Sequence, residues 1–197
     1  MSASEARRSP RSSPAPSNTT QSPARPQGAS GKPVRLLALD LATKTGWAVT
    51  ELGTGRVIKS GVKNLIPKSP LPLKFAQLAT LIKTIVEQHH IQAVITEAPN
   101  PFMVRSMENA RLALGLNTHA EFTTHTLELD FLQPLSTSTL KKHAATLVGD
   151  AKATKGKQQA MRAATSLLGR APVDDNEADA VVLGNWAALN AAVKEDA

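Results

Sequence analysis

The pattern of apolar and polar positions from Val34 onward predicts a first half made mainly of strands. VRLLALDLA, residues 34–42, is rich in branched apolar side chains and is typical of a strand buried on both faces. WAVTEL and RVIKSGVKNL follow at short spacing, separated by the turn signal GTG at residues 53–55. We therefore expect the first three strands to form an antiparallel meander.

Helical spacing begins at Leu71, and apolar residues then recur on one face as far as His90. IQAVITEAP, residues 91–99, predicts a further buried strand that carries Glu97 near its end. The rest of the chain predicts a helix over 103–127, a short strand over 130–135 and two or three further helices. This order predicts an α/β fold, with a mixed five-stranded sheet and helices on both faces.

Residues 1–33 differ sharply from the rest, because they hold 6 of the 13 prolines, 8 serines and almost no large apolar side chain. Such a segment buries too little apolar surface to order itself, so we expect a disordered tail and a folded domain over 34–197. Five basic residues against Glu5 give the tail a charge of +4. It is either a basic arm for nucleic acid or a solubilising leader; its prolines argue against a third interpretation, an organelle transit peptide.

The amino-acid composition excludes several kinds of site and several classes of protein. The chain has no cysteine, which excludes disulfides and thiolate zinc sites and fits a reducing compartment. No apolar run approaches the roughly 18 residues of a membrane helix, so we expect a soluble, cytoplasmic protein without a membrane partner. The net charge of +7 indicates an anionic partner.

Acidic residues stand where apolar neighbours make a charge costly. Asp40 lies inside the first strand and Glu97 at the carboxyl end of the fourth, where ligands of open α/β sheets gather. Asp175 and Asp179 share one face of the C-terminal helix, although Asp175 is equally well explained as the cap of that helix. Converging carboxylates are the usual ligands of Mg²⁺ or Mn²⁺, and two such ions activate water against a phosphodiester. The sequence thus predicts a metal site, although each acid alone also has an ordinary structural explanation.

Positive charge is concentrated between Lys141 and Arg170, where seven basic residues face Asp150 alone. Such a segment is typical of contacts to a nucleic-acid backbone, although a solvated helix face is the alternative. The turn after Asp40 carries Thr45 and Trp47 and brings backbone amides near a possible phosphate. Trp47 equally well starts the second strand and fills core.

Four segments together resemble the RuvC family of Holliday junction resolvases, within the RNase H-like nucleases, and especially its phage-type and compact bacterial members. They are LALDLATKTGWAV, VITEAP, LKKHAATLVGDAKATKGKQQAM and DDNEADAVVL. The resemblance spans residues 34–189 and implies an RNase H-like sheet with Asp40, Glu97 and Asp179 as metal ligands. Family members place a further acid or histidine where this chain has Asn176. Asp175 is our substitute, and Glu177 is a third candidate.

The resemblance also implies residues that contact DNA. Lysines in the third segment correspond to those that meet the backbone near the cut, and Phe102 corresponds to an aromatic wedge at the branch point. An ordinary core or cap phenylalanine is the alternative for Phe102. The expected DNA-contacting residues are Thr45, Phe102, Lys141, Lys142, Lys155 and Lys157.

The resulting hypothesis is a crossover junction endodeoxyribonuclease that uses two Mg²⁺ or Mn²⁺ ions to cut branched DNA such as four-way junctions, in a bacterial or phage-infected cell. Opposite cuts in a symmetric junction need two matched sites, so we expect a homodimer. The helix over 103–127 is a candidate for its interface or is part of the core; its apolar residues are Met107, Leu112, Leu114, Leu116 and Phe122.

Two other functional classes remain open. The segment DLATKTGWAV also resembles the first phosphate loop of ATP-binding actin-like and sugar-kinase-like proteins. Those proteins need two such domains, and this chain has room for one. A protein that binds nucleic-acid structure without cutting, or an RNA-end-processing nuclease of the same fold, is the second alternative.

Overall fold

The computed structural model describes residues 33–66, 68–99, 106–149 and 156–190, and these form one mixed α/β layer structure. Five strands make the sheet: β1 (Arg35–Asp40), β2 (Lys44–Glu51), β3 (Val57–Asn64), β4 (Ala93–Thr96) and β5 (Asp130–Phe131). Five helices accompany them: α1 (Leu71–His89), α2 (Met107–Thr126), α3 (Thr137–Val148), α4 (Gly156–Leu168) and α5 (Asp175–Asn190). The predicted tail lies outside the described residues.

The sheet has the order β3-β2-β1-β4-β5. β1 pairs antiparallel with β2, and β2 with β3, whereas β4 runs parallel to both β1 and β5. The predicted mixed five-stranded sheet with an antiparallel first part is therefore confirmed. The predicted strand over 130–135 is shorter than expected, because β5 ends at Phe131 and the chain rejoins the sheet only at Leu135, opposite Glu97.

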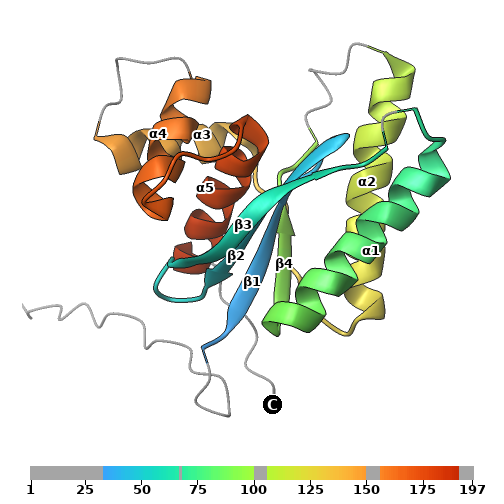
Figure 1. Ribbon diagram of the computed structural model, residues 1–197, viewed down its shortest axis with the longest axis horizontal. Helices are drawn as coiled ribbons and strands as arrows, with labels where there is room; N and C mark the ends of the chain where they lie inside the picture. The colour runs from blue at the N-terminus through green and yellow to red at the C-terminus, as the bar shows by residue number, and fades with distance from the viewer. Residues whose placement is uncertain (1–32, 67, 100–105, 150–155, 191–197) are drawn as a thin grey trace, which may run out of the picture.

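Helices cover both faces of the sheet (Figure 1). The face that carries Leu37 and Leu39 packs against Leu78 of α1 and Leu116 of α2. The opposite face, which carries Leu36 and Ala38, packs against α3 and α5. This double burial explains why β1 reads as a continuous apolar run rather than an alternating one. No helix among the described residues is long and apolar enough to cross a membrane.

Short polar signals set the helix boundaries. The Ser106 hydroxyl accepts a hydrogen bond from the Asn109 amide at 3.2 Å and caps α2. Ser136 caps α3 in the same way, and α3 ends at Gly149, whose φ of +67° suits glycine. The predicted helix over 103–127 is observed from Met107 to Thr126, and its first expected residues lie outside the described ones.

Candidate active site

Asp40 and Glu97 lie beside each other at the carboxyl ends of β1 and β4. The two strands are parallel with Leu39 opposite Thr96, and the Glu97 amide donates to the Leu39 carbonyl at 3.3 Å. Side chains alternate along a strand, so Asp40 shares the face of Ala38, and Glu97 shares the face of Ile95. Both belong to the face that packs against α5. The sheet therefore directs these two carboxylates toward the same helix.

Gly46 lets the start of α5 rest on the sheet beside Asp40. It pairs with Asp40 across β1 and β2. A Cβ atom on Gly46 would stand 1.9 Å from the backbone oxygen of Asn176, so only glycine fits this contact. Asp175 precedes the contact and Asp179 follows it by one turn, so both point along the same side of α5. Gly46 thus helps to bring the acids of α5 to Asp40.

Asp174, rather than Asp175, caps α5. The Asp174 carboxylate accepts a hydrogen bond from the Glu177 amide at 3.0 Å and pairs with Lys44 at 2.5 Å. The interpretation of Asp175 as the cap is therefore wrong. Instead, the Asp175 carboxylate forms an ion pair with Lys157 of α4. Asp175 is thus available on the Asp40 side of α5, although it is held by a lysine there.

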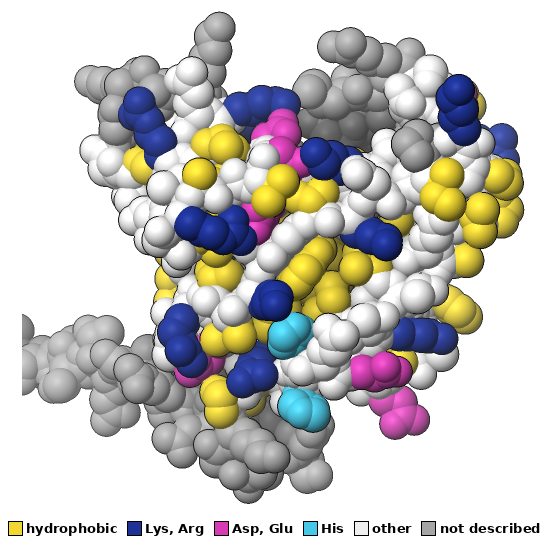
Figure 2. All heavy atoms as spheres, in the orientation of Figure 1, with side chains coloured by type: hydrophobic (Ala, Val, Ile, Leu, Met, Phe, Trp, Pro, Cys, Tyr) yellow, Lys and Arg dark blue, Asp and Glu magenta, His cyan; other side chains and the backbone are white. Residues whose placement is uncertain are grey.

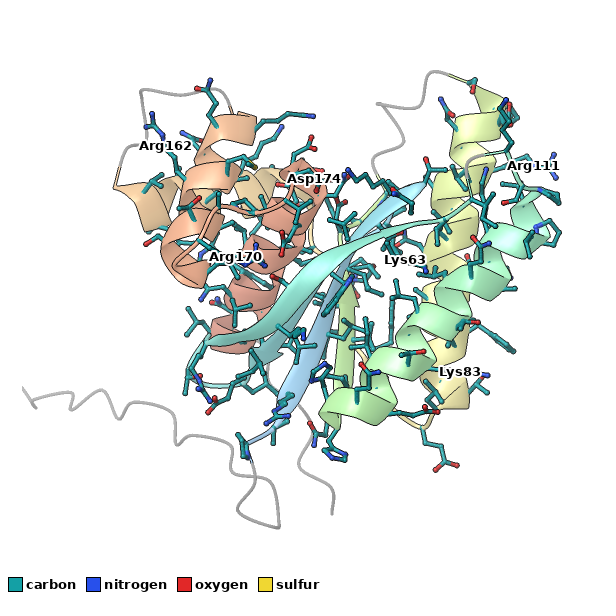
Figure 3. The ribbon with its side chains drawn as sticks, in the orientation of Figure 1. Lys63, Lys83, Arg111, Arg162, Arg170 and Asp174 are labelled. Carbon is teal, nitrogen blue, oxygen red and sulfur yellow. The ribbon has the colours of Figure 1, made fainter. Side chains whose placement is uncertain are left out.

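Glu177 is fully buried, and its partners come from β3 and from the segment that precedes α5. Its carboxylate accepts hydrogen bonds from Ser60 of β3 at 2.6 Å, from Arg170 at 2.6 Å and from the Val173 amide at 2.5 Å. Together with the cap at Asp174 these bonds fix the first turn of α5, in an arrangement that resembles a capping box but uses the Val173 amide in place of the Asp174 amide (Figure 3 labels Asp174 and Arg170). These partners use the Glu177 oxygens, so Asp175 is the better fourth acid.

Removing the Glu177 carboxylate is expected to loosen this turn. Glu177→Ala leaves Ser60 and Arg170 without their partner and should lower the free energy of unfolding by about 2–4 kcal/mol. Glu177→Gln keeps part of the hydrogen bonding and should cost less. Urea unfolding measures both. Glu51→Ala is the matched control, because its partner Arg56 is 69% exposed and such pairs contribute below about 1 kcal/mol. Equal losses in the two alanine variants would contradict the role given to Glu177.

Burial and mutual repulsion disfavour the charged forms of the site carboxylates. Burial raises the pKa of Asp40 well above its ordinary value, and the charges of Asp179, Glu97, Asp175 and Asp174 raise it further. Burial also raises the pKa of Glu97, against a hydrogen bond from Thr137 and the charge of Lys141. For Asp179, burial and then the charges of Glu97 and Asp175 raise the pKa to about 7. The acids therefore form an electrostatic cluster centred on Asp40.

The side-chain chemistry of this cluster fits a divalent cation, but its carboxylates are too far apart to share one. Hard carboxylate oxygens in negative excess are what Mg²⁺ and Mn²⁺ prefer. However, no three acidic or histidine side chains of the described residues stand close enough to share an ion. Two of the acids have partners of their own, because Glu97 accepts a hydrogen bond from Thr137 and Asp175 pairs with Lys157. The assignment of Asp40, Glu97, Asp179 and Asp175 as metal ligands therefore stays a prediction.

The raised pKa values predict that the metal-free protein loses stability as pH rises. A carboxyl group whose pKa is higher in the folded than in the unfolded chain stabilises the fold fully below the unfolded value, and this contribution disappears above the folded value. For Asp179 that window runs from about 4 to about 7. We expect the thermal midpoint in EDTA to fall by several degrees between pH 5 and pH 8, and to fall less in Asp179→Asn. A midpoint that rises over this range in the unsubstituted protein would contradict the electrostatic cluster.

Lysines flank the cluster on two helices. Lys141 of α3 is close enough to lower the pKa of both Glu97 and Asp179, and Lys157 of α4 pairs with Asp175. Lys142 is exposed beside Lys141. Figure 2 shows acidic side chains in the upper part of this face with Lys and Arg side chains around them. The structure thus brings predicted acids and predicted lysines together.

One expected DNA-contacting residue, Thr45, does not join this group, and two others cannot be placed. Thr45 is fully buried and its hydroxyl donates to the Ala42 carbonyl at 2.7 Å, so it shapes the turn and we remove it from the set. Phe102 and Lys155 lie outside the described residues. No pattern in the sequence singled out Thr137, whose hydroxyl donates to the Glu97 carboxylate from the start of α3. Asp174 and Glu177 could have been recognised from the capping-box spacing.

The apolar residues of α2 that we expected at a dimer interface fall into a buried group and an exposed group. Leu116 is fully buried and Leu112 is partly buried against the core, so these two belong to the fold. Met107, Leu114 and Phe122 are 77%, 58% and 68% exposed. Phe122 also lines an open groove of about 560 Å³ between α1 and α2, next to Phe75, which stacks on His119 at 4.0 Å. Only this exposed group remains available for an interface.

Solved structures similar to this chain include Holliday junction resolvases. RuvC of Thermus thermophilus in complex with a Holliday junction substrate aligns with a TM-score of 0.64 at 14% identity, covering 79% of this chain and 94% of RuvC. A second structure of the same RuvC gives a TM-score of 0.60 at 16% identity, with the same coverage of both chains. The yeast mitochondrial Holliday junction resolvase Ydc2 gives a TM-score of 0.55 at 17% identity, covering 85% of this chain and 81% of Ydc2.

Sequence comparison adds nothing to this likeness, because no protein-family model and no curated protein matches the chain. At identities of 14–17%, the structural likeness shows a shared fold and does not show a shared function. The alignment extends over most of both chains, so the likeness concerns the whole described domain and not a single motif. The chain therefore has the fold of RuvC-type Holliday junction resolvases.

Proposed function

We propose that this protein is a metal-dependent, structure-selective endodeoxyribonuclease that resolves four-way junctions or similar branched DNA. The observation that carries the proposal is the electrostatic cluster around Asp40, built from β1, β4 and α5 on a RuvC-type fold. RuvC of T. thermophilus is bound to a Holliday junction substrate, which supports branched DNA as the substrate class. Membership of a phage-type or compact bacterial branch and a cytoplasmic location remain predictions.

The residues of the chain take distinct roles in this proposal. Asp40, Glu97, Asp179 and Asp175 hold Mg²⁺ or Mn²⁺, and the bound cation supplies activation of water and stabilisation of charge on the phosphate. Thr137 orients the Glu97 carboxylate through its hydrogen bond. Lys141 neutralises part of the negative charge near Glu97 and Asp179, which lets a phosphate approach the carboxylates. Lys157 competes with the cation for Asp175.

A homodimer is part of the proposal, because two cuts on opposite strands need two sites. The exposed apolar residues of α2 are the proposed contact: Met107, Leu114 and Phe122. Light scattering at several protein concentrations measures the assembly state. A monomer at every concentration, with and without junction DNA, would contradict this part.

The test of the activity compares a labelled four-way junction with a linear duplex of matched sequence, in Mg²⁺, Mn²⁺ or EDTA. We expect paired nicks near the branch point with either metal, and none in EDTA or on the duplex. Tight junction binding without cleavage in any metal would favour the non-cleaving binding protein. Cleavage of RNA alone would favour the RNA-processing nuclease. The similar structures are resolvases, which gives no support to the ATP-binding alternative.

Neutralising the two lysines of α3 is expected to weaken binding without removing structure preference. Both side chains are exposed on α3, and backbone contacts carry no sequence information. In Lys141→Gln/Lys142→Gln, the slope of log affinity against log salt should fall by about 1.8, the value for two lost phosphate contacts on duplex DNA. Titrations in EDTA at four salt concentrations measure the slope. Lys83→Gln on α1 is the control, and an unchanged slope in the double variant would remove α3 from the DNA surface.

A further inference from the structure

Strand β3 forms an edge of the sheet, and its two faces are covered unequally. On one face α5 packs against β1, β2 and β3. On the other face α1 packs over β1 and does not extend over β3 in the same way (Figure 1). On this face Thr45 and Val49 of β2 are fully buried, whereas Trp47 is partly exposed and Lys59 and Lys63 of β3 are exposed. Figure 2 shows hydrophobic side chains in the hollow between β3 and α1, with Lys and Arg side chains along it.

Trp47 occupies this face and lies against a glycine. In the antiparallel pair of β2 and β3, Trp47 stands opposite Gly61, and opposite residues share a face. Three indole atoms stand 3.0–3.2 Å from the point that a Gly61 Cβ would occupy, so the absent side chain makes room for the indole. Trp47 packs on the core beside it but remains partly exposed. The strand pair thus leaves part of an aromatic ring accessible beside the edge strand β3.

Two lysines flank this ring on the same face. Lys59 stands opposite Val49, and Lys63 opposite Thr45, two residues on either side of the Trp47–Gly61 pair. Both lysines are exposed, and neither forms an ion pair with another described residue. Lys63 is labelled on β3 in Figure 3. Proteins bind single-stranded nucleic acid by stacking bases on aromatic rings and by contacting phosphates with basic side chains. Trp47, with a lysine about two residues away on each side, offers both kinds of contact.

The electrostatic surroundings of Lys59 support an anionic partner. Burial and then the charges of Lys59, Arg35 and His90 lower the pKa of His89 at the end of α1. These groups come from β1, β3 and α1 and gather positive charge near one end of the open face. The acids of the candidate active site belong to the opposite face of the sheet. A nucleic-acid strand bound on this face would therefore lie away from the negative charges of the candidate active site.

We propose that Trp47, Lys59 and Lys63 form a binding platform for single-stranded nucleic acid, with one base stacked on the indole. The platform lies on the face of the sheet away from Asp40, so it contacts an unpaired strand separate from any phosphate at the carboxylates. Binding there needs no metal and no cleavage. The proposal therefore stands or falls separately from the nuclease activity.

The chain offers a direct optical test, because Trp47 and Trp186 are its only tryptophans. In full-length Trp186→Phe, indole fluorescence reports Trp47 alone. We expect a 15-nucleotide oligo-dT in EDTA to quench this fluorescence, and a duplex at equal phosphate concentration to leave it nearly unchanged. Anisotropy of labelled DNA verifies that each ligand is bound. No quenching at saturating oligo-dT, equal quenching by duplex, or quenching by polyglutamate instead of DNA would each overturn the proposal.

Lysine variants test the platform without disturbing its core contacts. In Lys59→Gln/Lys63→Gln the salt slope for oligo-dT should fall by about 1.4, the value for two lost contacts on a single strand. Lys83→Gln on α1 should leave the slope unchanged. Trp47→Leu should weaken oligo-dT binding by about 5- to 150-fold if it folds, as circular dichroism would show. An unchanged slope in the double lysine variant would assign the binding to another surface.

Discussion

Asp40→Asn is expected to abolish cleavage of four-way junctions while keeping or tightening their binding. The substitution removes the carboxylate at the centre of the acidic cluster, where burial and four neighbouring acids already disfavour negative charge. Loss of several kcal/mol of transition-state stabilisation corresponds to a rate lower by at least about a thousandfold. Removal of one negative charge near the phosphates favours binding. Single-turnover cleavage and EDTA titrations measure the two effects separately.

The same variant should unfold at a higher temperature than the parent protein in EDTA. The raised pKa of Asp40 means that its charged form is held at a cost, and asparagine carries no charge. Asp130→Asn is the matched control, because Asp130 begins β5 opposite Ala93, at the other end of β4 from Glu97. Asp130→Asn should cleave normally. If Asp40→Asn lost folding and binding together, Asp40 would be a structural residue and the metal-site proposal would fail.

Gly46→Ala is expected to destabilise the protein by at least about 3 kcal/mol and to displace the start of α5. The added Cβ would stand 1.9 Å from the Asn176 carbonyl oxygen, and a backbone atom cannot turn aside as a side chain can. Either β2 or the first turn of α5 must move. Because that turn carries Asp175 and leads to Asp179, cleavage should fall with stability. Urea unfolding and cleavage at a temperature where the variant is folded measure the two effects.

Gly53→Ala provides the contrast for this substitution. Gly53 has a φ of +76°, and nothing lies within 4 Å of its Cβ position. Alanine there suffers only the cost of a left-handed backbone, about 1–2 kcal/mol, and the residue is remote from α5's first turn. Cleavage by folded Gly53→Ala should be unchanged. Equal stability losses and normal cleavage in both variants would show that the contact between Gly46 and Asn176 does not position the site.

The local pattern of the sequence was enough to place most elements. β1 and β4 were recognisable because branched apolar runs bounded by turn residues suit strands buried on both faces, and both are so buried. The interpretation of α1 rested on its single apolar face, which packs against β1. β5 was harder, because two paired residues carry little periodic signal and its length depends on where β4 offers partners.

The acidic residues could be recognised as candidate ligands because they lie in or beside apolar runs. The role of each one could not be recognised from the sequence. Asp174 and Asp175 are neighbours with the same side chain, and the sequence cannot tell which one caps α5. The structure separates them, because Asp174 meets the Glu177 amide and Lys44 whereas Asp175 meets Lys157. Glu177 was a third candidate for the fourth ligand, and its contacts with Ser60 and Arg170 became visible only in the structure. Such choices depend on partners more than a hundred residues away in sequence, as Ser60 is from Glu177.

The sequence by itself determined the α/β class, the antiparallel start of the sheet, the apolar helix faces and the set of acids worth attention. These properties follow from short-range periodicity and from the cost of charge in apolar runs. Only the tertiary structure decided that Gly46 lets α5 pack beside Asp40, that the Glu177 carboxylate binds Ser60 and Arg170, and that Trp47 lies against Gly61 of the edge strand. The physical reason is that strand order, helix docking and side-chain partners are set by long-range packing, which no local pattern encodes.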